Sequence, residues 1–398
     1  MPPIVISDGD DLPSGCLKFD DMIADGIDDF EKIEKTGVGY QDTIFLPYSS
    51  GTTGLPKGVE ISHKNIVSCI GQMSHEAINP TIEATKSYQD IIPVILPMFH
   101  IFALTLCVCK GLCYGAKLVC VPRFSTERFL QVLHKSRPTL IYVAPPIMQF
   151  LAYNDKVTRS HLESLRVIIS GAASLSNECI KRFQNRAPSD LAIAQGYGLT
   201  ETSPTLTLRK DSYQDINSTG FIIPNTQFRI VEYQKKKLGC NLGFDEVGEI
   251  YVRGPQIMKG YYKNPKATAE SMDGDWFKTG DLGFVKNDGA VFITGRLKEL
   301  IKVKGLQVSP LELEEVLQTH ENITDVAVIG VENDRFGEIP MAFVVSKPGS
   351  KISEDDIKDF VAQRLTKHKH LGHVKFVQQI PKSSAGKILR KELRRIAT

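Results

Sequence analysis

The chain has 398 residues, 42% of them hydrophobic, which predicts a large core and more than one domain. A net charge of only +2 gives no reason to expect binding to nucleic acid or to a membrane surface. Eight cysteines without a metal-site spacing suggest free thiols in a reducing compartment, and with no signal peptide, transmembrane segment or C-terminal S-K-L ending visible we expect a cytoplasmic protein.

The first forty residues are acidic and weakly periodic, so we expect residues 1–40 to form a surface or partly disordered segment. From Thr43 to about Gln195, short apolar runs alternate with segments of helical periodicity, which predicts an α/β domain with a mostly parallel sheet. The predicted strands are Ile44–Leu46, Ile91–Leu96, Lys117–Val121, Leu140–Ala144, Arg166–Ser170 and Leu191–Ala194. The predicted helices are His63–Ala77, Phe102–Tyr114, Thr126–Ser136 and Asn177–Asn185.

Near residue 220 the pattern changes to short β-like pieces separated by Gly, Pro, Asn and Asp. These pieces predict a small antiparallel or barrel-like subdomain, which completes a large domain of residues 41–296. Residues 297–398 then predict a compact α+β domain of ordinary size. The predicted strands of the two parts are Gln227–Glu232, Gly248–Arg253, Ala290–Thr294, Val326–Val331 and Ala342–Ser346, and the helices are Pro310–Thr319 and Ser353–Arg364.

The most informative segment, Tyr48–His63, reads Y-S-S-G-T-T-G-L-P-K-G-V-E-I-S-H. Its small residues let backbone N–H groups and hydroxyls converge on an anion, and Lys57 adds a mobile positive charge. The spacing from Gly51 to Gly58 does not fit the P-loop pattern G-x-x-x-x-G-K-[ST]. The composition alone also fits an ordinary turn, but the arrangement favours a polyphosphate ligand.

Further segments carry chemistry of the same kind, although each also fits a structural role. Gln195–Glu201 combines glycines with the aromatic face of Tyr197 and with oxygen ligands from Thr200 and Glu201 that suit Mg²⁺. The same segment also fits a glycine turn capped by Thr and Glu. The small residues of Ser170–Ala173, after a predicted strand, provide room for an adenine ring or simply pack closely. In Trp276–Gly283, Asp281 lies in a predicted glycine turn, where its oxygens suit a ribose diol or an Asx-turn.

Three more positions extend the set. Arg296 provides a rigid guanidinium fork at the predicted domain boundary. His100, among apolar neighbours, fits either a hydrogen-bonded core histidine or a catalytic one. The glycine loop Pro381–Arg390 contains two lysines, which are either solvated charges or groups able to reach a site.

In this order the segments closely resemble the motif series of the adenylate-forming (AMP-binding) enzymes, from about Thr43 to Arg395. Leu96–Phe102 and Gly248–Pro265 resemble most the branch of coumarate–CoA ligases and luciferase-like acyl-CoA synthetases. The resemblance implies an acid–CoA ligase with ATP, Mg²⁺ and coenzyme A, in which a carboxylic acid is adenylated with release of pyrophosphate and then transferred to CoA. It also implies that the C-terminal domain is a mobile lid.

The resemblance assigns a role to each matching residue. The phosphates would be bound by Ser49, Ser50, Gly51, Thr52, Thr53, Gly54 and Lys57. Adenine would lie between Tyr197 and Gly171, Ala172 and Ala173, near Gln195, Gly196 and Gly198, and the ribose on Asp281 and Arg296. Thr200 would contact the α-phosphate, Glu201 would hold Mg²⁺, and Lys387 would catalyse adenylation. His100 would gate an acyl pocket lined by Phe102 and Leu106. The hinge would be Lys298, Gln307 would face the nucleotide, and Lys302, Lys304 and Gly305 would serve thioester formation.

Only 47 residues precede Tyr48, where the resembling family has a long lobe. We therefore expect an incomplete N-terminal lobe, with apolar surface open to a partner. A catalytically weak or regulatory nucleotide-binding fragment is one alternative, and a luciferase-like or carrier-loading enzyme is another. The substrate acid is expected to be aromatic or a medium-to-long aliphatic chain, and by analogy with the family a peroxisomal location is also an option.

Overall fold

The computed structural model describes residues 4–5, 14, 17–18, 37–49, 56–122, 124–173, 175, 177–209, 213, 215–233, 239–383 and 386–397. These residues belong to two compact units, Met1–Asp42 and Thr43–Thr398. In the first unit, strands β1 (Ile4–Val5) and β2 (Leu17–Lys18) pair in parallel. The second unit contains all the other elements described below.

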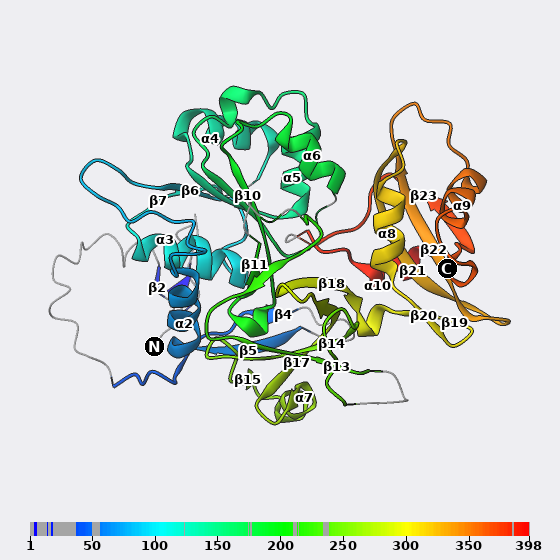
Figure 1. Cartoon of the computed structure of the whole chain (residues 1–398). Helices are drawn as coiled ribbons and strands as arrows, with labels where there is room; N and C mark the ends of the chain where they lie inside the picture. Colours follow the sequence, from blue (N-terminus) through cyan, green and yellow to red (C-terminus); the bar gives the residue numbers. More distant parts are fainter. Residues whose placement is uncertain are drawn as a thin grey trace. The chain divides into compact units, whose positions relative to one another are not determined.

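A ten-stranded open sheet forms the centre of the second unit (Figure 1). Its strand order is β13-β14-β17-β18-β12-β11-β10-β9-β8, with β16 paired to β17. Neighbouring strands are parallel from β8 to β10 and antiparallel elsewhere. The strands are β8 (Leu140–Val143), β9 (Val167–Ser170), β10 (Ala192–Gly198), β11 (Thr205–Leu208), β12 (Gly220–Ile222), β13 (Gln227–Val231), β14 (Gly248–Arg253), β16 (Met272–Asp273), β17 (Trp276–Val285) and β18 (Ala290–Arg296).

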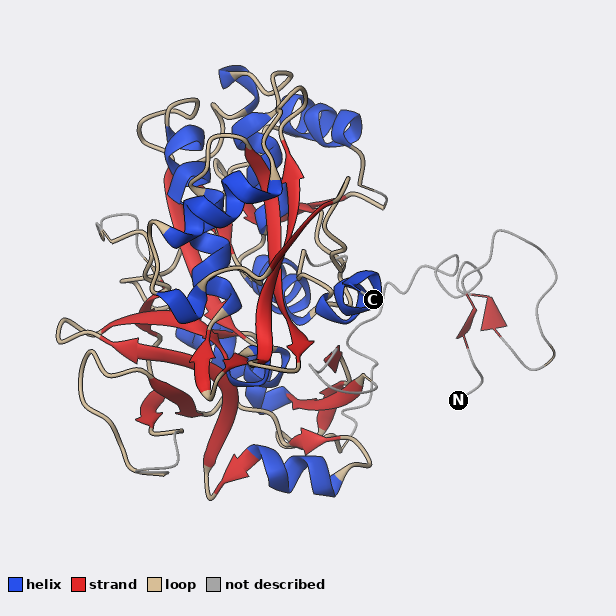
Figure 2. Ribbon diagram, turned by 90° about the vertical axis from the view of Figure 1, so that its right-hand side faces the viewer, coloured by secondary structure: helices blue, strands red, loops and turns tan. Residues whose placement is uncertain are grey.

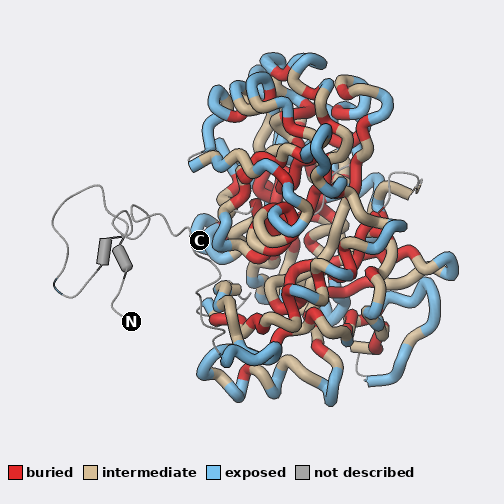
Figure 3. Tube along the Cα trace, turned by 90° about the vertical axis from the view of Figure 1, so that its left-hand side faces the viewer, coloured by how far each residue is buried: buried red, intermediate tan, exposed pale blue. Residues whose placement is uncertain are grey.

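Apolar side chains cover both faces of the parallel strands, because alternate residues of a strand point to opposite faces. One face packs against α4 (Thr126–Ser136), α5 (Pro145–Tyr153) and α6 (Asn177–Gln184). The other packs against the π-helix η2 (Ala103–Cys109), which continues into α3 (Lys110–Cys113). Figures 2 and 3 show the helices beside the strands and the buried residues concentrated between these layers.

Two smaller sheets and several short elements flank the large one. β15 (Gly260–Tyr261), β5 (Lys57–Ser62) and β3 (Thr43–Phe45) form one sheet, with β4 (Tyr48–Ser49) also paired to β5. β6 (Ile91–Val94) and β7 (Lys117–Cys120) pair in parallel. Helix α2 (His63–Met73) follows β5 directly, because the Ser62 hydroxyl accepts a hydrogen bond from the Asn65 backbone N–H and caps the helix. The remaining elements here are η3 (Arg159–His161), η4 (Thr200–Thr202) and α7 (Pro265–Ser271).

The C-terminal elements gather around their own sheet, whose order is β20-β19-β22-β21 with β23 paired to β22. Their apolar side chains form two clusters, one of them under α8 and α9 (Figure 1). The elements are η5 (Leu297–Glu299), β19 (Ile301–Val303), β20 (Leu306–Val308), α8 (Pro310–Gln318), β21 (Ile323–Asn333), β22 (Gly337–Ser346), α9 (Glu354–Ala362), η6 (Lys367–Lys369), β23 (His373–Phe376) and α10 (Arg390–Ala397). We call the residues from Leu297 onward the lid.

The predicted fold class, a mixed α/β large domain followed by a small α+β domain, is confirmed. Two local predictions were wrong: Gln195–Gly198 continue strand β10, and Trp276–Gly283 lie in strand β17 rather than in turns. The antiparallel strands after residue 220 join the open sheet, and in the described residues they do not close into a separate barrel. The domain boundaries at 40 and 296 stay predictions.

Candidate active site

A cavity of about 710 Å³ opens where the ends of β9, β10, β14 and β17 meet the lid. Its lining combines residues from distant parts of the sequence, from Tyr48 to Lys387. The charged side chains among them are Lys57, Glu201, Glu249, Glu270, Lys278, Arg296, Lys298 and Lys387. Apolar residues from α2, η2, β9 and β11 complete the wall. The cavity therefore has a polar part and an apolar part, which suits two unlike reactants.

Asp281 of β17 is fixed between one partner on the adjacent strand β18 and another on the more distant strand β10. It lies opposite Arg296 in the β17–β18 pair, and its Oδ1 is 2.7 Å from Arg296 Nε. The Tyr197 hydroxyl of β10 donates to Asp281 Oδ2 at 2.8 Å. Burial raises the pKa of the Tyr197 phenol well above its ordinary value, so this hydroxyl stays protonated and donates. Burial also raises the pKa of the Asp281 carboxyl, which Arg296 and Tyr197 oppose.

Glu201 occupies the short helix η4, just after the β10 strand, and its side chain is nearly buried. Its Oε1 accepts a hydrogen bond from the Tyr261 hydroxyl at 2.9 Å. The Lys57 Nζ lies 4.6 Å from the centre of the Tyr261 ring. Tyr261 therefore contacts a cation through its ring and a carboxylate through its hydroxyl. Thr200 and Tyr261 line the same part of the cavity. This cluster combines one carboxylate with nearby hydroxyl groups and a cation.

Lys387 enters the cavity from the lid, on a hairpin closed by the Lys382–Ile388 bridge. The Ser383 N–H donates to the Lys387 carbonyl at 2.8 Å, and the Lys387 N–H donates to Ser383 Oγ at 3.2 Å. Burial, and next the charge of Arg296, lower the pKa of the Lys387 ammonium to about 8. An anionic ligand beside Lys387 would favour the charged form of this ammonium.

The apolar part is formed by Met73, Phe102, Leu106, Ile169 and Leu208. All five belong to the core cluster on the η2 face of the parallel strands. A Cβ on Gly171 would lie 3.3 Å from the Phe102 ring, so the glycine permits a close approach. His100 lines the cavity nearby, and burial lowers the pKa of its imidazole, which favours the neutral form.

The structure brings most of the predicted site residues to this one cavity. The predicted residues that line it are Ser49, Lys57, His100, Phe102, Leu106, Gly171, Ala172, Gly196, Tyr197, Gly198, Thr200, Glu201, Arg296, Lys298 and Lys387. Asp281 reaches the group through Tyr197 and Arg296. Ser50, Gly51, Thr52, Thr53 and Gly54 lie outside the described residues. Ala173 is not among the lining residues, and the Gln195 side chain instead donates to the Ile216 carbonyl.

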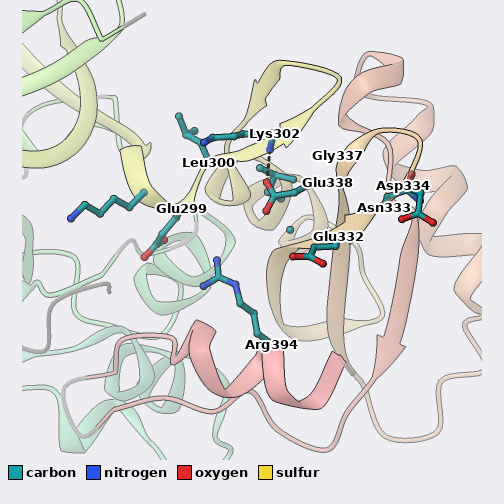
Figure 4. A pocket seen from close by; sticks show the side chains of 12 residues that line it. Glu299, Leu300, Lys302, Glu332, Asn333, Asp334, Gly337, Glu338 and Arg394 are labelled. Carbon is teal, nitrogen blue, oxygen red and sulfur yellow. Dashed lines mark hydrogen bonds between the residues drawn. The ribbon is translucent and has the colours of Figure 1, made fainter. Parts of the chain in front are cut away.

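Four predicted residues lie apart from the cavity, on the β19–β20 hairpin of the lid. They are Lys302, Lys304, Gly305 and Gln307. Lys302 borders a second, more open hollow of about 530 Å³, and its backbone N–H donates to Glu338 at 2.7 Å (Figure 4). Lys304 lies over the Phe336 ring. Their assignment to nucleotide contact and thioester formation stays a prediction.

Several lining residues were not predicted from the sequence, including Tyr261, Met73, Ile169, Thr205 and Leu208. Strand β15, which carries Tyr261, is held in place by pairing with β5, where Gly260 lies opposite Glu60, 200 positions earlier in the chain. Local sequence pattern does not reveal such a pairing, and so it does not reveal the contact of Tyr261 with Glu201. Among the described residues, no three His, Cys, Asp or Glu side chains form a metal-binding group. No described helix is long and apolar enough to span a bilayer.

Comparison with known proteins identifies the family of the chain. Residues 3–262 match the family model of the AMP-binding enzyme, and residues 312–387 match that of the AMP-binding enzyme C-terminal domain. The chain is 40% identical to 4-coumarate–CoA ligase 1 of Arabidopsis thaliana over 389 residues, covering 96% of this chain and 68% of the relative. It is also 40% identical to 4-coumarate–CoA ligase 2 of Oryza sativa subsp. japonica, covering 98% of this chain and 68% of that one.

Solved structures are similar as well. ATP-bound MatB from Rhodopseudomonas palustris superposes with a TM-score of 0.81 at 27% identity, covering 90% of this chain and 69% of that chain. MenE, the O-succinylbenzoate coenzyme A synthetase of Bacillus subtilis in complex with AMP, gives a TM-score of 0.76 at 27% identity, with coverage of 90% and 70%. The chain belongs to the AMP-binding enzyme family, among the adenylate-forming acid–thiol ligases that resemble 4-coumarate–CoA ligases.

Proposed function

We propose that the chain activates a carboxylic acid with ATP, forms an acyl adenylate and pyrophosphate, and transfers the acyl group to coenzyme A. The observation that carries this proposal is the single cavity in which Arg296, Glu201 and Lys387 meet an apolar wall, with Asp281 held by Arg296 and Tyr197 beside it. A nucleotide needs the polar part and an acyl group needs the apolar part. The relatives named as 4-coumarate–CoA ligases support a carboxylic acid as the substrate and coenzyme A as the acceptor.

The polar part accounts for nucleotide recognition. Asp281 has two acceptor oxygens for the ribose hydroxyls, and Arg296 and Tyr197 hold the carboxylate in place. Gly171, Ala172 and Gly196 leave room beside the Tyr197 ring for a flat base. Lys57, whose Nζ lies 4.6 Å from the centre of the Tyr261 ring, would meet the terminal phosphates together with the Ser49 hydroxyl.

The donor set also fits Mg²⁺, which proteins usually bind through one or two carboxylates together with substrate phosphates. Glu201 Oε1 accepts from Tyr261, while Oε2 accepts no hydrogen bond from the described residues and is available to a cation. When bound, Mg²⁺ would offset negative charge on phosphate oxygens. Thr200, the residue before Glu201, would supply a hydroxyl beside the phosphate chain.

In the adenylation step, the carboxylate of the acid attacks the α-phosphorus and pyrophosphate leaves. Charge increases on the phosphate oxygens, so positioned cations lower the barrier more than acid–base groups do. The Lys387 ammonium has three donors on a compact head and would bridge the carboxylate and the α-phosphate. Its hairpin geometry and the charges of Arg296, Glu299 and Asp281 acting on its ammonium support this role.

In the second step, the thiolate of coenzyme A attacks the acyl carbonyl and AMP leaves. Lys302 borders the open hollow, with Lys304 and Gly305 on the same β19–β20 hairpin, whereas Lys387 lines the main cavity. We propose that the lid rotates about Lys298, which borders both the main cavity and the open hollow, and so exchanges one face for the other.

Replacing Lys387 by Ala separates the two steps. We expect Lys387→Ala to lower acid-dependent exchange between ATP and pyrophosphate by at least about 100-fold, because one charge donor to the transition state is lost. The variant should still convert a supplied acyl adenylate and coenzyme A to the thioester. Lys367→Ala, at an exposed lid lysine, is the matched control and should retain exchange. Exchange at the normal rate in Lys387→Ala would contradict this assignment.

A further inference from the structure

The wall of the apolar part consists almost entirely of hydrocarbon. Met73 comes from α2, Phe102 precedes η2, Leu106 lies within η2, and Ile169 and Leu208 come from β9 and β11. Each is no more than 8% exposed, and all belong to one core cluster. A group seated against this wall therefore contacts side chains that are already packed in the core.

None of the five residues of this wall is charged, and the charged residues that line the cavity stand at other positions. Lys57 and Glu201 meet on Tyr261, and Arg296 pairs with Asp281. Lys110 lies behind the same core cluster but does not line the cavity. Its Nζ donates to Asn79 and Thr81 at 2.7 and 2.8 Å, and the residue has no exposed surface. A second carboxylate seated against these five residues would thus meet no charged partner among them.

None of the five wall residues has a side chain that donates or accepts a conventional hydrogen bond. Tyr142 packs edge-on against Phe102, with ring centres 5.8 Å apart, and its hydroxyl is buried behind that ring. The Ser170 hydroxyl is likewise buried and out of reach of a ligand. Thr205 lines the cavity, but it already interacts with the Cys69 thiol, whose pKa burial raises to about 11 against the opposing effect of Thr205. A substrate hydroxyl at this wall would lose water without gaining an equivalent partner.

We propose that the substrate is an acid with a hydrocarbon acyl group, an unsubstituted aryl or alkyl chain, without a hydroxyl or second carboxylate at the end remote from the reacting carboxylate. Leu106 determines this selectivity, because it places a branched apolar side chain on the wall. This inference rests on the proposed ligase function. It separates this chain from the relatives named for 4-coumarate, an acid that carries a ring hydroxyl.

The test measures kcat/KM for acyl-CoA formation with cinnamate, octanoate, 4-hydroxycinnamate and hexanedioate. An added hydroxyl in an apolar pocket lowers kcat/KM by up to about 100-fold. We therefore expect the kcat/KM of cinnamate or octanoate to exceed that of 4-hydroxycinnamate by about 10- to 100-fold. Hexanedioate should be poorer still. Equal or better use of 4-hydroxycinnamate overturns the inference.

A binding measurement keeps this outcome separate from failure of the ligase function. Titration calorimetry with the acyl sulfamate analogues of cinnamoyl and 4-hydroxycinnamoyl adenylate ranks the two acyl groups without any turnover. Tighter binding of the cinnamoyl analogue supports the inference even if no acid is converted, and that absence of conversion would refute only the proposed function. Tighter binding of the hydroxylated analogue overturns the inference.

Paired variants test the role of Leu106. Leu106→Ala and Leu106→Ser make similar space, but only serine adds a hydroxyl to the wall. We expect the ratio of 4-hydroxycinnamate to cinnamate kcat/KM to be about 10-fold higher in Leu106→Ser than in Leu106→Ala. Leu112→Ala, at an exposed leucine that does not line the cavity, should leave the wild-type ratio unchanged. Equal ratios in the two Leu106 variants overturn the specificity role.

Discussion

Gly386 allows the Lys387 hairpin to approach the large domain. Its φ is +82°, in the left-handed region, and it is buried beside α5. A Cβ at this position would lie 2.8 Å from Cδ of Pro146 and 3.4 Å from the Ala144 Cβ. Alanine would therefore strain the backbone and also hold the hairpin away from the cavity.

We expect Gly386→Ala to lower the kcat of pyrophosphate exchange by about 10- to 100-fold, since a displacement of about 1 Å in a reacting group has effects of that size. Gly349→Ala is the matched control, because Gly349 lies in the lid with φ of +80° and a Cβ there would meet no atom within 4 Å. Exchange kinetics of the two variants check the prediction. Equal activities of the two variants would contradict the prediction.

At the scale of elements, Arg390 joins four parts of the lid. As the first residue of α10, it donates to Glu299 in η5 at 2.7 Å and to the Val328 carbonyl in β21 at 2.9 Å. It also donates to both carboxylate oxygens of Glu314 in α8, at 2.6 and 3.2 Å. The Glu314 side chain is 4% exposed and that of Arg390 is 14% exposed, so solvent screens this pair little.

We expect Arg390→Ala to lower the free energy of unfolding by about 3 kcal/mol, because it leaves Glu314 buried without its partner. Burial already raises the pKa of the Glu314 carboxyl against the opposing charge of Arg390. Arg394→Ala, on the exposed face of the same helix, should change stability by less than about 0.5 kcal/mol. Denaturant unfolding of both variants measures the difference, and a similar small effect in both would contradict the prediction.

Elements with local signals were predictable from the sequence. Helix Thr126–Ser136 was predicted with the bounds of α4, because Ser125 caps it and its periodicity is clear. The segment Phe102–Tyr114 was predicted as helical, but its apolar pattern does not distinguish a π-helix from an α-helix. Strand β17 was interpreted as a turn because its glycines hid the pairing with β14 and β18, which depends on distant residues.

The candidate site was also predictable only where the sequence carries a local signal. Residues in recognisable motifs, such as Glu201 and Lys387, were predicted to meet, and they line one cavity. The apolar wall was predicted only at Phe102 and Leu106, because its other members come from α2, β9 and β11 and have no local signature. Chemistry-bearing residues are thus visible in the sequence, whereas the shape around them comes from tertiary packing.

For the molecule as a whole, stability depends on a charge buried in the large domain. Lys110 is fully buried, and its Nζ lies 4.2 Å from the centre of the Tyr114 ring. Burial lowers the pKa of its ammonium from the ordinary 10.5 to about 8, although Asp90 opposes the shift. Between pH 8 and 10.5 the unfolded chain therefore binds more protons at this residue than the folded one, and the Lys110 contribution to stability rises with pH.

We expect the free energy of unfolding of the wild type, measured against that of Lys110→Met, to increase by about 2 kcal/mol from pH 8 to pH 10.5. Taking the difference removes the contribution of other titrating groups, such as Cys69, whose pKa burial raises to about 11 and which acts in the opposite direction. Lys117→Met, at an exposed lysine in β7, is the matched control and should give a difference that is independent of pH. A flat difference for Lys110→Met as well would mean that the buried amine keeps its charge in the folded protein, held by Asn79 and Thr81.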